Sequence, residues 1–124
     1  MLPSVKQVTS LGTYRDGGSV SASFLGENGI EYTLLFPVKM DRALGKVGYK
    51  PPVLELYNPA EYSSKVTGER IPYTVKSTEP ISWQDSAALL QQMASFISGF
   101  HSEYLWVFPE MQRAAANLGT NVGT

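Results

Sequence analysis

Residues 19–36 read SVSASFLGENGIEYTLLF, and this stretch decides the fold class. Apolar side chains alternate with polar ones on both sides of an Asn28-Gly29 pair, which is typical of a β-hairpin. A three-residue loop would pair Phe24 with Tyr32, whereas a two-residue turn would set Phe24 opposite a threonine. We therefore predict the three-residue loop, with Gly29 in the left-handed conformation that such a loop requires.

The same register divides the hairpin into two faces. Ala22 lies opposite Leu34 on an apolar face, and Ser23 lies opposite Thr33 on a polar one. This pattern predicts an antiparallel sheet with one face on a core and the other in water. Such a sheet supports many functions, so it does not specify the chemistry.

A further strand is expected before the hairpin. Residues 8–14 alternate weakly, and Asp16-Gly17 suits a two-residue turn. The expected pairs are Leu11 with Ala22 and Thr9 with Phe24. Pro37 is predicted to end the third strand or to mark it as an edge, because proline cannot donate a hydrogen bond to the ladder.

The middle of the chain is expected to hold a long loop and two short strands. Two glycines and a proline pair interrupt residues 39–52, which predicts an exposed loop. Residues 53–57 and 71–76 each favour a strand, and the polar stretch 61–69 between them favours a loop. Pro72 places the later strand at an edge.

Helical periodicity begins after residue 81. It predicts a helix over 82–98, with Ser82 as N-cap, Asp85 completing a capping box and Gly99 as the stop. Its broad buried face is expected to comprise Trp83, Ala87, Leu90, Ala94 and Ile97, widened by Leu89, Met93 and Phe96. The aromatic run 104–108 is interpreted as a buried helical turn.

A second helix is expected near the C-terminus. Pro109 suits its first position, and Gly119 suits its end. Strands therefore come first and helices last, which predicts one α+β domain over residues 1–119. We expect an antiparallel β-meander of about four to five strands with two C-terminal helices packed on one face. Residues 120–124 are predicted to be a disordered tail.

Composition narrows the protein class. The chain has 124 residues, 43% hydrophobic and 17% charged, with a net charge of -1, which is typical of a globular domain. Cysteine is absent, so disulfides, thiolate nucleophiles and thiolate metal sites are excluded. No apolar stretch approaches the roughly 20 residues of a spanning helix, and the N-terminus does not resemble a signal peptide. We therefore expect no membrane association and a soluble, cytoplasmic protein.

The sequence predicts no catalytic residue, cofactor or metal site. Its single histidine, His101, follows the helical stripe and is interpreted as a capping or packing residue at the helix end. The eleven acidic residues are spread singly along the chain, so no acid–base pair is marked. Neither a phosphate-binding glycine loop nor a nucleophile elbow occurs.

A protein partner is the favoured ligand class. Residues 39–50 carry a net charge of +3, and several tyrosines lie in or near the expected loops. Tyrosine suits interfaces because it combines apolar area with a hydrogen-bonding tip. The candidate partner-binding residues are Lys39, Arg42, Lys46, Tyr49, Lys50, Tyr57 and Tyr62. The slightly acidic chain argues against a nucleic-acid partner.

Three functional hypotheses follow. A non-enzymatic binder is preferred, and the general build favours a small immunity protein that neutralises a bacterial toxin by occluding its active site, although no motif is diagnostic of it. The second is a homo-oligomeric structural or assembly subunit, joined through strand edges or the aromatic run near Trp106. The third is an enzyme or ligand-binding protein with a pocket between sheet and helices, where Tyr73, His101 and Trp106 converge.

Overall fold

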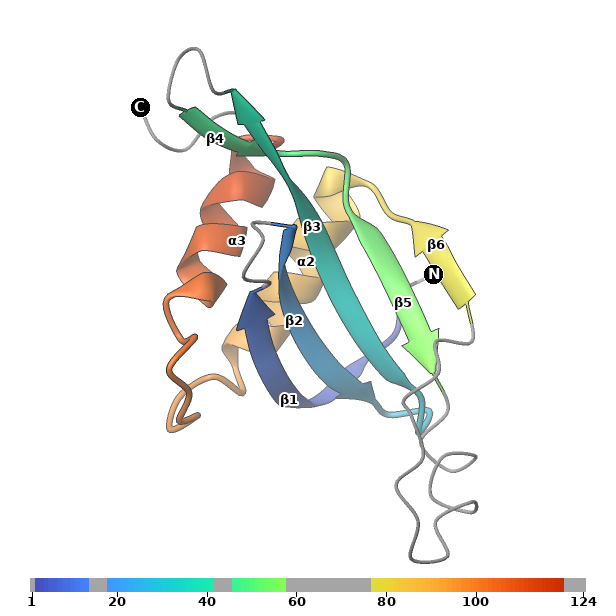
Figure 1. Ribbon diagram of the computed structural model, residues 1–124. Coiled ribbons are helices and arrows are strands. Elements are labelled where there is room, and N and C mark those ends of the chain that lie inside the picture. The colour runs from blue at the N-terminus through green and yellow to red at the C-terminus, as the bar shows by residue number, and fades with distance from the viewer. Residues whose placement is uncertain (1, 14–17, 42–45, 58–76, 120–124) are drawn as a thin grey trace, which may run out of the picture.

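The computed structural model describes residues 2–13, 18–41, 46–57 and 77–119, which form an antiparallel sheet backed by two helices (Figure 1). The elements are β1 (Val5–Thr13), β2 (Ser19–Gly26), β3 (Glu31–Asp41), β4 (Lys46–Tyr49), β5 (Val53–Tyr57), β6 (Ser77–Pro80), α2 (Trp83–Ala94) and α3 (Val107–Ala116). The strand order is β1-β2-β3-β5-β6, and β4 pairs with the far end of β3. Both helices lie behind the sheet in Figure 1, which confirms the predicted α+β class.

The central hairpin has the predicted register. Phe24 pairs with Tyr32, and their rings stack with centroids 5.1 Å apart. Gly29 has a φ of +83°, the left-handed conformation that the three-residue loop requires. Phe24, together with Ala22, Leu34 and Phe36, is completely buried against the helices, so this hairpin forms the centre of the core.

The other face of the hairpin is polar but is not in water along its whole length. Ser23 and Thr33 are only 7% and 6% exposed. Their hydroxyls bond to each other at 2.8 Å, and the Thr33 hydroxyl also bonds to that of Tyr57 in β5. Because neighbouring strands satisfy these groups, they need no water. The prediction of a solvated face is therefore wrong for Ser23 and Thr33.

A β-bulge changes the predicted register of β1. Leu11 pairs with Ala22 as expected, but Val8 rather than Thr9 lies opposite Phe24. The register shifts between Val8 and Ser10, and this extra residue lets both Val8 and Leu11 face the core. The predicted turn at 16–17 lies outside the described residues.

Pro37 does not end β3, and residues 39–52 are not one long loop. β3 pairs with β5 through residues 31–35 and with β4 through residues 38–41, so Pro37 lies where the strand changes partner. A missing N–H is tolerated at this point, and the Pro37 carbonyl accepts a bond from the Lys50 N–H at 2.8 Å. Both predictions are therefore wrong.

Residues 53–57 form the predicted strand, β5. Its partner β6 covers residues 77–80, a segment for which no strand was predicted. All four β6 residues are exposed, so the segment lacks the apolar alternation that sequence reasoning uses. The predicted loop 61–69 and strand 71–76 lie outside the described residues, as does the predicted tail 120–124.

The first helix starts as predicted and ends earlier. The Ser82 hydroxyl caps α2 by accepting a bond from the Asp85 backbone N–H at 3.0 Å. The helix ends at Ala94, and turns continue to Gly99. Its buried residues are Ser86, Leu89, Leu90 and Met93. Leu89, Leu90 and Met93 belong to the predicted face, so that part of the prediction is confirmed. Ala94 and Phe96 are exposed, so the buried face is narrower than predicted.

The run 104–108 is a turn leading into α3, but it is not buried throughout. Leu105 is 41% and Trp106 is 53% exposed, which contradicts the prediction. The helix begins at Val107, so Pro109 is its third residue; proline is tolerated there because the first N–H groups of a helix lack intrahelical partners. None of the described helices is long and apolar enough to span a membrane.

Candidate functional site

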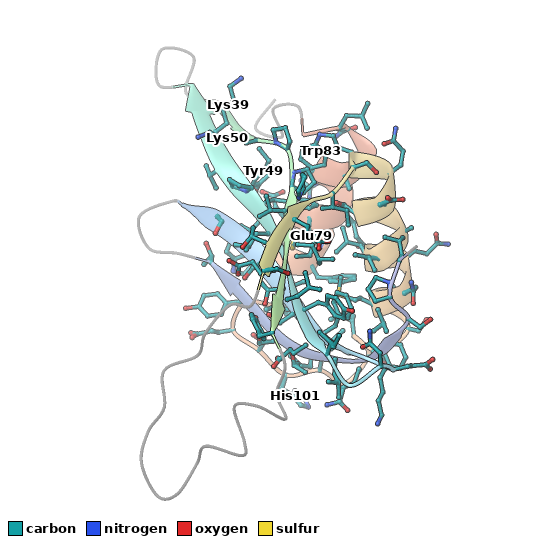
Figure 2. All side chains as sticks on the ribbon, turned by 90° about the vertical axis from the view of Figure 1, so that its right-hand side faces the viewer. Lys39, Tyr49, Lys50, Glu79, Trp83 and His101 are labelled. Atoms are coloured by element: carbon teal, nitrogen blue, oxygen red, sulfur yellow. The ribbon has the colours of Figure 1, made fainter. Side chains whose placement is uncertain are left out.

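The predicted basic residues are only partly placed by the structure. Lys39 in β3 and Lys50 after β4 are exposed, and they lie at the same end of the sheet in Figure 2. Lys46 belongs to β4 and pairs with Asp41 through the backbone. Arg42 and Tyr62 lie outside the described residues, as does the side chain of Lys46. A partner-binding role for these residues stays a prediction.

Tyr49 is a core residue that connects β4 to α3. It is 6% exposed, and its hydroxyl donates a bond to Glu110 Oε2 at 3.2 Å. Burial, together with the Glu110 charge, raises the pKa of Tyr49 to about 12. Its ring also meets Phe36 edge-on at 6.0 Å. The prediction that Tyr49 belongs to an exposed loop is therefore wrong.

Tyr57 lies on the opposite face of the sheet. Its hydroxyl bonds to Thr33, which points away from the helices, whereas Tyr49 contacts α3. Burial raises the pKa of Tyr57 above its usual value. Tyr49 and Tyr57, the two candidate tyrosines that the structure describes, therefore do not form the common contact surface that the sequence suggested.

The predicted pocket of Tyr73, His101 and Trp106 is not formed by its described members. His101 is exposed in the connection between the helices, so it does not pack in the core, and Tyr73 lies outside the described residues. Neither His101 nor Trp106 lines the cavity described below. Within the described ranges, no group of three His, Cys, Asp or Glu residues could hold a metal ion.

Large apolar side chains are exposed in the α2–α3 connection, residues 95–106. Phe96 is 41% exposed, and Leu105 and Trp106 are exposed to 41% and 53%. The fold prediction placed Phe96 on the buried helix face and Leu105 and Trp106 in a buried turn, whereas the assembly hypothesis used the run near Trp106 as a contact surface. An apolar run does not reveal which of its members reach the core. This connection is the first candidate contact site.

A cavity of about 520 Å³ lies at the other side of the molecule, between the start of α2, the strands β5 and β6, and the N-terminal segment. Its lining comprises Leu2, Pro3, Asn28, Tyr32, Leu54, Leu56, Glu79, Pro80, Ile81, Ser82 and Asp85. Figure 2 looks onto this edge of the molecule, with Glu79 labelled on β6 beside α2. Tyr32 and Leu54 are buried, whereas Glu79 and Asp85 are exposed.

Sequence reasoning missed this cavity because its walls come from five separate segments. Of its lining residues, Asn28 and Tyr32 were predicted only as parts of the hairpin, and Ser82 and Asp85 only as a helix cap. Their cap is present, which shows that the same residues both start α2 and line the cavity. No sequence pattern reports that β6 and the N-terminal segment meet there.

Comparison with protein-family models, with curated proteins and with solved structures finds no match. The functional argument therefore depends on the geometry and chemistry of this chain.

Proposed function

We propose that this chain is a non-enzymatic protein-binding module. The observation that carries the proposal is the exposure of Phe96, Leu105 and Trp106 in one connection. Exposed large apolar side chains gathered in one segment are typical of interaction sites, and tryptophan is enriched among the residues that dominate binding energy. The α2–α3 connection is therefore the proposed contact site.

Within this class, we propose an immunity protein that acts in the bacterial cytoplasm and occludes the active site of a toxin. A connection that carries exposed aromatic side chains suits insertion into a concave active site. The exposed Lys39 and Lys50 form a second candidate contact region that would attract an acidic partner. The support is the general build of the chain together with these two surfaces.

Self-association is the second candidate, and the same exposed side chains favour it. A second copy of the chain could bury Trp106 and Leu105 as well as a foreign partner could. Analytical ultracentrifugation separates the two proposals, because a homo-oligomer gains mass with concentration in the absence of any other protein.

The test is affinity capture from the lysate of the source organism with a tagged wild-type protein and a tagged Trp106→Ala variant. We expect one partner with toxic or hydrolytic activity, retained in near one-to-one amount by the wild type and at least tenfold less by the variant. The matched control is Leu118→Ala, which also removes an exposed apolar side chain, 56% exposed, but outside the connection. Equal retention by Trp106→Ala and the control would contradict the proposed contact site.

A further inference from the structure

We infer that the cavity between β6 and the start of α2 binds an organic cation, an ammonium or guanidinium group carried on an apolar stem. The inference is independent of the proposed protein-binding function. The cavity lies beside β6, well away from the α2–α3 connection in Figure 1.

The size and floor of the cavity suit a small organic molecule or a long side chain. Its volume of about 520 Å³ lies within the range typical of small-ligand sites. Leucine, isoleucine, proline and tyrosine side chains form most of its lining. Such a floor favours an alkyl stem over a compact hydrated ion.

The charged residues of the lining are all acidic. Glu79 comes from β6 and Asp85 from the first turn of α2, and none of the described residues that line the cavity is a lysine, arginine or histidine. Among the described residues, neither carboxylate forms an ion pair. Two carboxylates that form no ion pair with the described residues, placed beside apolar side chains, favour a cation over an anion through charge complementarity.

The start of α2 does not offer an anion site. Its Ser82 hydroxyl already accepts a bond from the Asp85 N–H, so one of the free N–H groups of the first turn is satisfied. The Asp85 carboxylate in the same turn also offsets the positive end of the helix dipole. An anionic ligand would meet both carboxylates of the cavity.

Hydrogen bonds hold two walls of the cavity, one locally and one between distant segments. The Asn28 amide donates to the Tyr32 hydroxyl at 2.9 Å. The Gln92 side chain of α2 donates to the Pro3 carbonyl at 3.2 Å and accepts from the Val5 N–H at 2.9 Å, which holds the N-terminal wall. A preformed cavity binds its ligand without first ordering these segments.

The experiment is an NMR titration of the ¹⁵N-labelled protein with n-hexylamine, n-hexanol and hexanoate. We expect saturable shifts of the Ile81, Ser82 and Asp85 amides with the amine, at least about tenfold weaker binding of the alcohol and none of the carboxylate. Added salt is expected to weaken amine binding. Equal affinity for amine and alcohol, or shifts confined to other residues, would overturn the inference.

Charge-neutral variants locate the site. Glu79→Gln and Asp85→Asn are each expected to weaken hexylamine binding about two- to fivefold. The control Glu103→Gln removes an equal charge from an exposed carboxylate that does not line the cavity, and is expected to leave binding unchanged. An unchanged affinity in both cavity variants, or an equal loss in the control, would refute the assignment.

A final titration distinguishes a cation carried by a protein side chain from a free amine. A blocked lysine amide, titrated beside hexylamine, represents the side chain of a protein. Tighter binding of the blocked lysine would support a basic side chain as the natural ligand, and tighter binding of hexylamine would support a free amine. If neither cation shifted the cavity amides at millimolar concentration, the inference would fail.

Discussion

The packing of the helical layer differs between the strand β4 and the strand β6 at the other side of the sheet. At β4, which we call the closed end, the Tyr49 N–H donates to the Gly119 carbonyl at 3.0 Å and the ring of Trp83 lies against Gly119. At β6, which we call the open edge, the start of α2 leaves the cavity of about 520 Å³. Trp83 and Asp85 are two residues apart in α2, yet Trp83 packs in the closed end and Asp85 lines the cavity of the open edge.

The comparison shows that a residue whose chemistry suggests binding can instead stabilise the fold. Tyr49 and the basic residues near it suggested a binding surface, but the tyrosine is used to join β4 to α3. Glu79 lies in a segment without any sequence signal, yet it lines the cavity. Packing decides which polar groups remain available to a ligand.

The largest effect is expected from Gly119→Ala at the closed end. An added Cβ would lie 2.3 Å from Trp83 Cζ2 and 2.8 Å from the Tyr49 carbonyl oxygen, and the residue has a φ of +76°. We expect a loss of about 2–4 kcal/mol in the free energy of unfolding, from overpacking and backbone strain together. Urea denaturation measures it.

Gly29→Ala is the matched control for that variant. Gly29 has a similar φ of +83°, but an added Cβ would meet nothing within 4 Å. Only the backbone cost of about 1 kcal/mol is expected there. If the two alanine variants lost equal stability, the closed end would not be tightly packed around Gly119.

The next effect is a loss of stability in alkali that depends on Tyr49. Its pKa is about 12 in the folded protein and about 10 in the unfolded chain, so the folded state binds more protons between these values. The stabilising contribution of the raised pKa of Tyr49 is therefore complete below pH 10 and is lost as the pH rises towards 12. We expect the free energy of unfolding to fall by about 2 kcal/mol over this range because of this residue.

Tyr49→Phe isolates this contribution, because other tyrosines such as Tyr57 titrate in both proteins. At neutral pH the variant is expected to be about 1 kcal/mol less stable, since it lacks the hydrogen bond to Glu110. The difference should shrink and then reverse between pH 10 and 12. Stability curves of the two proteins that stay parallel over this range would disprove the assigned role.

Ser82→Ala tests the open edge, with a smaller expected effect. The variant removes the cap hydroxyl that accepts from the Asp85 N–H, which costs about 1 kcal/mol. Ser82→Asn, which can also cap, is the control and should retain most of the stability in thermal denaturation. A loss as large as that of Gly119→Ala would show that the open edge is as tightly coupled to the fold as the closed end.

The hairpin register and the helix start could be predicted from sequence because each depends on neighbouring residues. The Phe24–Tyr32 pairing follows from alternation and a loop length, and the Ser82 cap follows from one turn of helix. The exposure of Trp106 and the cavity at Glu79 depend on which distant segments meet. Local patterns carry no such information. The fold class could therefore be predicted, the run near Trp106 could be named only as one possible contact surface, and the cavity at Glu79 could not be predicted.

The smallest expected effect is a gain, and it concerns the end of α3 next to Gly119. Leu118 has a φ of +53° and follows the helix in a Schellman motif, in which the Gly119 N–H bonds to the Ala114 carbonyl at 2.7 Å. Leucine is strained in this conformation and is 56% exposed, so Leu118→Gly is expected to stabilise the protein by about 0.5–1 kcal/mol. Leu118→Ala keeps the strain and should give no gain. If thermal denaturation showed both variants to be destabilised equally, Leu118 would hold the closed end together by packing, despite its exposure.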